Sequence, residues 1–306
     1  MIRTLALALA LAGAPTALAQ DFVLEETQSL DFDDPESWAM KYFSSASVMT
    51  ALGPVRERGA GELELELEGI AVPDLSVEQR MVGFGGLKEE DLNRAPAFGR
   101  IRLGAGLGGR FSLTVGWMPP LEIDGVEADL WSLALERPIF AGRRWSLGWR
   151  VFGQTGEARG DLTCTAADAA QPPGSPGNAF GCREPSRDEV TLEHLGVELV
   201  AGVTLGERWR LHFGAGAVEH DLEFQVDALT FDFLDRTLLV TDGSSATATA
   251  GATLRLGPKL ALAGELFYSP LDRRRRRDQP FEDPELVRVI DDELLHLRAM
   301  VRYRLR

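Results

Sequence analysis

The strongest constraint on the fold of this chain is an alternation of apolar and polar residues that runs through most of it. From about Gly61 onward, apolar residues recur at every second position. Successive side chains of a β-strand point to opposite faces, so the pattern predicts two-faced strands rather than helices. The last segment is the clearest, with Leu295, Leu297, Ala299, Val301, Tyr303 and Leu305 separated by His296, Arg298, Met300, Arg302, Arg304 and Arg306.

The connections between these segments alternate between short and long. Soluble sandwiches show no such bias, whereas outer-membrane barrels have short periplasmic turns and long external loops. The rhythm therefore predicts an all-β fold, an antiparallel transmembrane β-barrel. Tight turns are expected at 106–109, 137–144, 205–207 and 257–259, and long polar stretches at 73–96, 159–188, 220–243 and 270–292, with a shorter one at 118–125.

About ten strands are expected, because an even number brings both ends of the barrel to the periplasmic side. The segment ahead of them is ambiguous. Asp33-Asp34-Pro35-Glu36 is a good helix start, yet residues 43–52 could form a further strand and raise the count to about 11 or 12. We expect a short helix that plugs or underlies the barrel. The ten strands are expected at 61–71, 97–107, 110–118, 126–136, 145–157, 190–205, 208–220, 245–256, 259–269 and 294–305.

The first residues have the features of a cleavable secretion signal. Arg3 precedes an apolar run at 5–12, and Ala17-Leu18-Ala19 has the form of a cleavage site. Later apolar runs fall short of the roughly 18 residues that a membrane helix needs, so a membrane form must be a closed barrel. We therefore expect a signal peptide at 1–19, a periplasmic or lumen segment at 20–59, and a barrel at 60–306 in the outer membrane of a Gram-negative bacterium.

Aromatic residues recur at two levels of the expected barrel. One level lies where strands follow a tight turn, and the other lies at the opposite strand ends. Amphipathic rings at both levels predict the interfacial girdles of a membrane barrel. The first level holds Phe111, Trp145, Trp209 and Tyr303, and the second holds Trp117 and Tyr268.

The final residues resemble the C-terminal assembly signal of outer-membrane proteins, in which a polar residue and a glycine precede two alternating hydrophobic residues. Arg298, Tyr303 and Leu305 stand in the matching places, while Met300 occupies the glycine position and Arg306 ends the chain. The whole-chain pattern also looks like that of uncharacterised Gram-negative outer-membrane barrels. The resemblance implies insertion by the barrel-assembly machinery and contact with lipid and lipopolysaccharide, and it implies no substrate.

Two cysteines, Cys164 and Cys182, share a polar segment rich in Pro, Gly, Ala and Asp. An exported chain meets an oxidising compartment, so they are expected to form a disulfide in an external loop. A metal or nucleophile role is the competing interpretation, and no cluster of His or Cys nearby supports it.

Charged residues follow the polar face of the first and last strands. In a closed barrel these strands are neighbours, so a carboxylate row would face an arginine row across the lumen wall. Such a network would fill a narrow barrel rather than leave an aqueous pore. The expected network comprises Glu62, Glu64, Glu66, Glu68, Arg100, Arg102, Arg298, Arg302 and Arg304.

A second basic group, the run Arg273, Arg274, Arg275, Arg276 and Arg277, falls in an expected external loop. Guanidinium groups suit phosphate, so contact with lipopolysaccharide is one interpretation and a solvated loop is the other. The net charge of -15 excludes nucleic acid as a partner, because phosphates demand a basic face.

Three functions from different classes fit these observations. A structural or surface-interaction barrel with a charged, largely self-filled lumen comes first, because about ten strands leave little free space. A small-solute channel comes second, and an enzyme acting at the outer rim comes third. No serine has a nucleophile motif, so the histidines are expected to lie in a polar lumen network; they are His194, His212, His220 and His296.

No cofactor or metal site is indicated. The glycine run at 104–109 satisfies a G-x-G-x-x-G pattern formally. A dinucleotide fingerprint must open a helix, and here an alternating strand follows, so the glycines indicate a hairpin turn. The small-molecule ligand, if the barrel has one, cannot be named from these residues.

Overall fold

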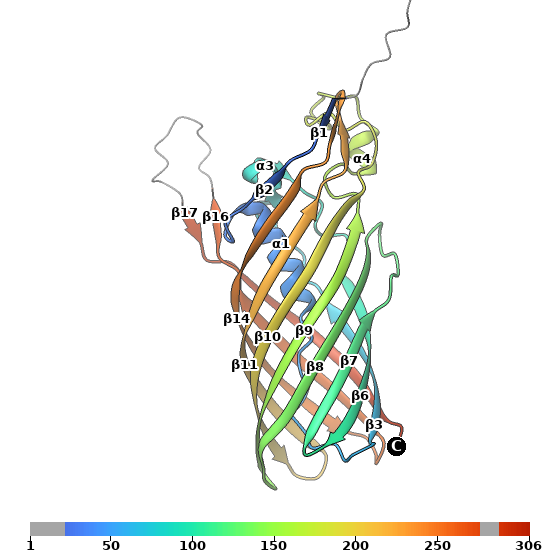
Figure 1. Cartoon of the computed structure of the whole chain (residues 1–306), viewed down its shortest axis with the longest axis vertical. Helices are drawn as coiled ribbons and strands as arrows, with labels where there is room; N and C mark the ends of the chain where they lie inside the picture. Colours follow the sequence, from blue (N-terminus) through green and yellow to red (C-terminus); the bar gives the residue numbers. More distant parts are fainter. Residues whose placement is uncertain (1–21, 276–287) are drawn as a thin grey trace, which may run out of the picture.

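The protein is a closed antiparallel β-barrel of ten strands in its computed structural model, which describes residues 22–275 and 288–306 (Figure 1). Each barrel strand pairs with its neighbour in sequence, and the last pairs with the first, so no edge is left open. The prediction of a ten-stranded barrel is confirmed. The strands are β3 (Leu63–Ala71), β6 (Ala97–Gly108), β7 (Phe111–Met118), β8 (Glu127–Ala141), β9 (Trp145–Gly160), β10 (Asp188–Leu205), β11 (Trp209–Gln225), β14 (Leu238–Arg255), β15 (Leu260–Pro270) and β18 (Glu293–Arg304).

The wall of the barrel is much taller on one side than on the other. Strands β10 and β14 have 18 residues each, whereas β7 has 8. The tall strands extend beyond the bounds expected from sequence, because they continue into segments that look like polar loops. Above His220, β11 turns Asp221 and Glu223 outward and Leu222 inward, so the strand continues with a polar outer face and an apolar inner face.

One tight turn is shorter than expected. The turn placed at 137–144 begins only after Ala141, because β8 continues to that residue through an irregularity between Pro138 and Phe140. Proline has no backbone N–H for the ladder, so the register of the strand shifts at Pro138 and the strand then continues. The turn at Gly108 and Gly109 is a β6–β7 hairpin with positive φ at both glycines, and β7 follows it directly.

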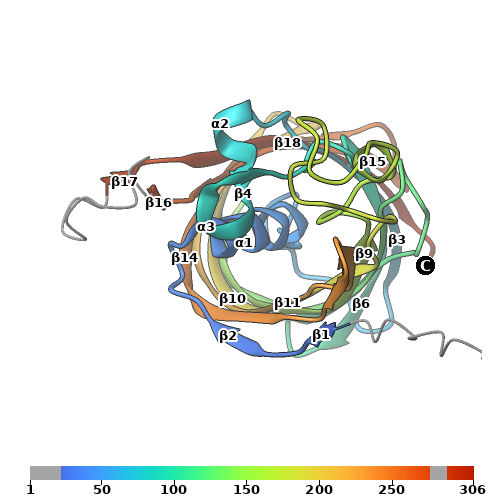
Figure 2. The same cartoon turned by 90° about the horizontal axis from the view of Figure 1, so that it is seen from above.

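The segment before the barrel enters the lumen. Helix α1 (Pro35–Ser47) lies inside the barrel, against β10 and β11 (Figures 1 and 2). Ahead of it, β2 (Thr27–Ser29) pairs in parallel with the upper end of β14, and β1 (Phe22–Leu24) pairs with β13 (Phe233–Asp235). Residues 22–29 therefore lie at the end with the long loops, and the plug that follows them enters the lumen from that end.

The remaining elements belong to the long loops at that same end (Figure 1). None of the helices in residues 22–275 and 288–306 is long and apolar enough to cross a membrane. These loop elements are α2 (Val77–Arg80), β4 (Met81–Val82), α3 (Gly83–Gly86), β5 (Lys88–Glu89), α4 (Ala166–Ala169), β12 (Ala228–Thr230), β16 (Arg273–Arg275) and β17 (Arg288–Ile290).

The hydrophobic core lies in the upper half of the barrel, between α1 and the wall. Trp38, Tyr42 and Met49 pack with wall residues such as Phe267 and Leu294. Met40 joins a second cluster with inward-facing residues of several strands. Below this level the lumen is lined by charged and polar side chains, which form the candidate site.

Candidate functional site: the plugged lumen

Residues 35–58, called here the plug, run down the lumen from the long-loop end. Trp38 Nε1 donates to Leu271 O at 2.9 Å, and Tyr42 Oη donates to Pro73 O at 2.8 Å, which fixes α1 near the mouth. After Ser47 the chain continues without regular structure, and Leu52 and Arg58 are buried. The plug therefore occupies the lumen with its own backbone.

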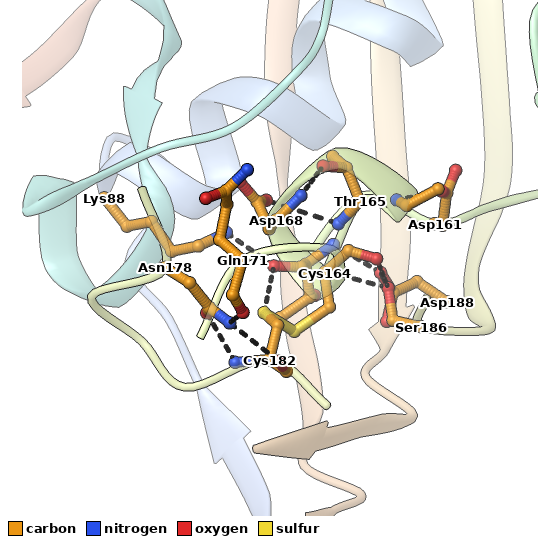
Figure 3. Close-up of a disulfide and its surroundings, with 12 residues drawn as sticks. Lys88, Asp161, Cys164, Thr165, Asp168, Gln171, Asn178, Cys182, Ser186 and Asp188 are labelled. Atoms are coloured by element: carbon orange, nitrogen blue, oxygen red, sulfur yellow. Dashed lines mark hydrogen bonds between the residues drawn. A yellow bond between two sulfur atoms is a disulfide. The ribbon is translucent and has the colours of Figure 1, made fainter. Parts of the chain in front are cut away.

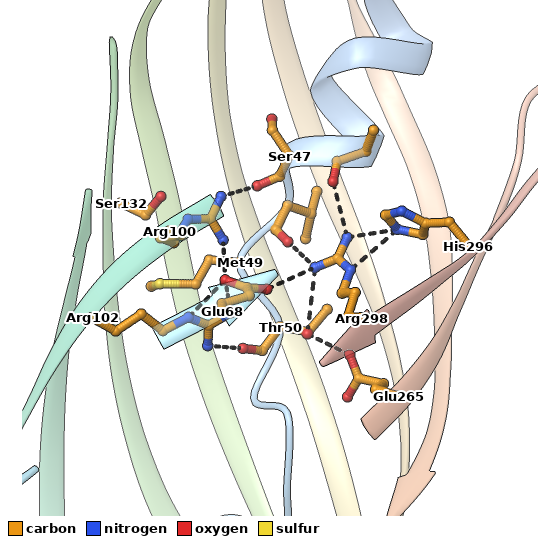
Figure 4. Close-up of polar contacts among 12 residues, drawn as sticks. Ser47, Met49, Thr50, Glu68, Arg100, Arg102, Ser132, Glu265, His296 and Arg298 are labelled. Atoms are coloured by element: carbon orange, nitrogen blue, oxygen red, sulfur yellow. Dashed lines mark hydrogen bonds and ion pairs between the residues drawn. The ribbon is translucent and has the colours of Figure 1, made fainter. Parts of the chain in front are cut away.

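Four wall arginines bind the backbone of the plug where the helix ends, and Figure 4 shows three of them, Arg100, Arg102 and Arg298. Arg298 donates to the carbonyl oxygens of residues 45, 46 and 48, Arg100 to that of residue 47, Arg150 to that of residue 49, and Arg102 to Thr50 O at 2.8 Å. The last carbonyls of a helix have no partner within the helix and carry partial negative charge. Guanidinium groups satisfy both needs, and these four arginines are called here the arginine collar.

The expected carboxylate row lies on the inner face of β3, and Glu64, Glu66 and Glu68 are almost fully buried. Arg302 Nε lies 2.7 Å from Glu66 Oε1. Arg102 Nη2 lies 2.5 Å from Glu68 Oε2, and Arg100 Nη1 lies 3.3 Å from the same oxygen. The structure thus brings together both expected rows from β3, β6 and β18.

Two members of the expected network are placed differently. Arg298 lies 4.0 Å from Glu68 Oε1, while its main partners are plug carbonyls and His296, because the helix end offers closer acceptors. Arg304 pairs with Glu62 at 2.8 Å near the turn end of the barrel, where 44% of the arginine side chain is exposed. These two arginines therefore have different roles, although the sequence pattern treats them alike.

Sequence reasoning missed the arginines of the plug. Arg58 Nε lies 2.9 Å from Glu64 Oε2 and its Nη1 lies 2.9 Å from Glu136 Oε1, while Arg56 Nη2 lies 2.6 Å from Glu64 Oε2. The signal was present, since Arg56 and Arg58 directly precede the glutamate row. The row is therefore neutralised as much by the plug as by the last strand.

Inward-facing glycines mark the path of the plug along the wall. A Cβ on Gly148 would lie 2.5 Å from Val55 Cβ, and a Cβ on Gly106 would lie 2.0 Å from the Gly59 carbonyl oxygen. Positions that oppose the plug so closely have no room for a side chain. Glycines at the polar-face parity of a strand were a second signal that sequence reasoning did not use.

The structure places all four histidines in the lumen, as part of the polar network. His220 Nδ1 lies 2.9 Å from Ser44 Oγ of α1, and its Nε2 lies 2.8 Å from Ser245 Oγ. His212 Nε2 lies 2.8 Å from Glu265 Oε2. His194 also contacts Ser44, and His296 accepts from Arg298. Ser44 thus contacts two histidines, and the second nitrogen of His220 faces Ser245 rather than a carboxylate.

The aromatic residues expected in two girdles lie on the outer face of the barrel. Trp145, Trp209 and Tyr303 are exposed near the short turns, and Tyr268 is exposed at the other end. Trp117 stacks on Trp131 with ring centroids 5.5 Å apart. Phe111 packs edge-on against Trp149.

The two cysteines are joined in a disulfide within the loop that follows β9 (Figure 3). Asn178 holds the loop in shape, because its Nδ2 donates to Cys182 O at 2.8 Å and its Oδ1 accepts from Cys182 N at 2.7 Å. Cys164 N donates to Ser186 Oγ, which in turn donates to Asp188 Oδ2 at the start of β10. These hydrogen bonds therefore tie the disulfide-bonded loop to the rim of the wall.

The loops at 73–96 and 161–187, called here the outer lid, pack against each other above the plug. Phe84 stacks on Phe180 with ring centroids 5.0 Å apart. Lys88 Nζ donates to Thr163 O at 2.6 Å and pairs with Glu90. Burial raises the pKa of the Glu90 carboxyl to about 8, against the opposing effect of Lys88.

Arg273 does not lie at an exposed, phosphate-accessible position. Its side chain is buried, its guanidinium lies 5.2 Å from the Trp38 ring centroid, and Nη1 donates to Glu78 O at 2.8 Å. A cation packed on an aromatic face under a loop serves the packing of α1. Arg274 and Arg275 belong to β16, and Arg276 and Arg277 lie outside the described residues.

One group of carboxylates among the described residues is close enough to share a cation. Asp31, Asp33 and Asp34 bring oxygens within 4.8 Å of one another just ahead of α1. Acidic residues at this position also suit the positive end of a helix, so the cluster has a structural explanation and supports no metal assignment.

No protein-family model matches the chain, and no curated protein matches it in sequence. Its structural neighbours include the attachment invasion locus protein Ail of Yersinia pestis, with 8% identity, a TM-score of 0.28, and coverage of 80% of this chain and 99% of Ail. The outer membrane protease OmpT of Escherichia coli has 8% identity and a TM-score of 0.34 over 80% of this chain and 94% of OmpT. The toluene transporter TodX of Pseudomonas putida has 14% identity and a TM-score of 0.34 over 94% of this chain and 78% of TodX.

These neighbours are outer-membrane β-barrels, and the likeness is one of fold alone. They are an attachment protein, a protease and a transporter. Fold does not imply function, so the function of this chain has to be argued from its own residues.

Proposed function

We propose that this chain is an outer-membrane barrel whose lumen is closed by its own plug and whose role is structural or lies in interactions at the outer surface. The observation that carries this proposal is the arginine collar. Four buried guanidinium groups bind backbone carbonyls of the plug rather than side chains alone. We expect a plug held in this way to be a fixed part of the barrel and to block a continuous water path for solutes.

The outer face of the barrel supports a membrane location. On β10, outward-facing residues from Leu195 to Leu205 include no charged side chain, and Glu193 lies just above them. About ten steps of roughly 3.3 Å, tilted by roughly 40°, give an apolar band about 25 Å tall. That height is typical of outer-membrane barrels.

The same proposal includes export by a signal peptide at 1–19, assembly by the barrel-assembly machinery, and outer-leaflet lipid and lipopolysaccharide as surroundings. Residues 1–19 lie outside the described part of the chain. The long loops would face the outside of the cell, as the asymmetry of their lengths suggests. A porin-like channel is the alternative that an experiment must exclude.

The test is ion conductance of the refolded barrel in planar lipid bilayers. We expect the wild-type protein to give no steady conductance, and a variant with all four collar arginines replaced by glutamine to give discrete open events. Steady conductance of the wild type would refute the plugged barrel and favour the channel. Cell fractionation tests the location separately: a protein that is heat-modifiable and sediments with the outer membrane supports it, and a soluble periplasmic monomer contradicts it.

A further inference from the structure

The barrel wall has an opening above β7, where the hydrogen-bond ladder stops. β7 ends at Met118, and Pro119 and Pro120 follow; neither proline has a backbone N–H to donate, and both restrict the backbone. The last β6–β7 pair is Ile101 with Trp117, and the last β7–β8 pair is Met118 with Leu130. Beyond this level, described residues 97–100 pair with β3 alone and residues 127–129 pair with β9 alone. This gap between β6 and β8 is called here the side window.

A cavity of about 320 Å³ lies behind the side window, in the part of the lumen that α1 leaves free. Its inner lining is apolar and comes from α1 and from several strands. Arg100 and Glu68 of the charged network line it too, so the cavity borders the arginine collar. The inner apolar residues are Phe43, Phe98, Met118, Leu130, Val190 and Leu192.

The cavity continues through the wall to the outer face of the barrel. Leu67 and Ile101 line it as well, and these side chains point outward and are 53% and 42% exposed. One continuous space is thus bounded by inward-facing Leu130 and by outward-facing Ile101. A ligand that entered sideways, past Pro119 and Leu121, would reach the cavity without crossing the plug.

The side window lies at the upper aromatic level of the barrel. Trp117 and Trp131 stack at its lower corner, and Trp117 Nε1 donates to Asp129 Oδ1 at 2.9 Å. Aromatic side chains with one polar edge, such as tryptophan, are enriched at the membrane interface between lipid headgroups and hydrocarbon. Polar groups rim the outer part of the cavity, with Arg94 paired to Asp161 and Arg159 paired to Glu189.

We propose that this cavity binds one alkyl chain, which enters through the side window while its headgroup stays at the polar rim. The volume lies at the lower end of small-ligand pockets, which measure about 300–1,000 Å³, and the apolar lining matches hydrocarbon. The chain belongs to a free fatty acid or to a lipid of the surrounding leaflet. The inference goes beyond the proposed function, because a plugged barrel needs no occupant in this cavity.

The experiment is photo-crosslinking in nanodiscs with a dodecanoyl chain that carries a terminal diazirine. One arm supplies the chain as the free acid, and the other supplies it esterified in phosphatidylcholine. We expect crosslinks on inward-facing peptides, above all at 190–192, besides the background on the outer face. Ala158→Trp fills the cavity and should reduce the inward crosslinks at least about tenfold, and Ala128→Trp, which also lines it, is the second filling variant.

Ala217→Trp is the matched control, because residue 217 is exposed on the outer face of β11 and does not line the cavity. It should crosslink like the wild type, and heat-modified migration checks that each variant is folded. Inward crosslinks from either arm support the proposal and name the source of the chain. Crosslinks confined to outward residues, or inward crosslinks that both folded filling variants retain, would overturn it. Neither outcome alters the result expected from the conductance test of the plug, so the two proposals can fail independently.

Discussion

At the scale of single residues, Arg298 shows how one buried cation can serve both the wall and the plug. Its side chain is fully buried, it donates to three plug carbonyls and to His296, and its guanidinium lies over the Phe267 ring. Buried charges are tolerated only where partners surround them, and removing one partner leaves the others unsatisfied. The contacts at this residue therefore hold the end of α1 in place.

Arg298→Gln should destabilise the barrel by about 3–5 kcal/mol, because several buried acceptors lose their donor. Arg304→Gln is the control, since Arg304 pairs with Glu62 at the exposed end and should contribute no more than about 1 kcal/mol. Urea unfolding followed by tryptophan fluorescence measures both. Equal shifts of the two midpoints would contradict the role given to Arg298.

At the scale of elements, the plug fits the wall through glycines. Gly148→Leu should push residues 53–56 away from β9 and lower the stability by about 1–3 kcal/mol, because the added side chain collides with Val55. The same change at Gly69 has open space around it and should be neutral. The temperature at which migration on electrophoresis changes would compare the two variants. If Gly148→Leu behaves like Gly69→Leu, the close contact is not maintained.

The disulfide belongs to the outer lid and not to the barrel wall. Replacing Cys164 and Cys182 together by alanine should remove about 3 kcal/mol of loop stabilisation while the barrel still assembles. Limited proteolysis should then cut within 161–187 sooner than in the wild type, and heat-modified migration should be unchanged. Loss of the folded barrel itself would show that the lid is needed for assembly.

At the scale of the whole molecule, the described part of the chain runs from the end that carries the long loops to the opposite end through the lumen. Leu238 pairs with Thr27 on the rim, and the first barrel strand begins only after the plug has crossed to the short turns. An epitope inserted ahead of Phe22 should therefore be labelled on intact cells. An epitope in the turn at 206–208 should be labelled only after the outer membrane is opened, and the reverse pattern would contradict this orientation.

The sequence by itself determined the barrel. Strand existence and most strand bounds follow from the period of two, because each strand exposes one face to an apolar surrounding and one to a polar lumen. The extension of β11 was missed because above His220 its outer face is charged and its inner face is apolar, which makes the strand look like a charged loop.

Only the tertiary structure decided what fills the barrel. Residues 48–58 have no periodic pattern. Arg56 and Arg58 pair with the nearby Glu64, but the partners of residues 48–55 include wall arginines and glycines that lie from about 50 to 250 positions away in sequence. The collar binds backbone carbonyls, which every residue possesses, so no side chain of the plug predicts these contacts from the sequence. The cavity likewise arises from unequal strand lengths around a closed ring. Local alternation fixes the two faces of each strand, whereas the contents of the lumen depend on contacts between segments that meet only after the barrel has closed.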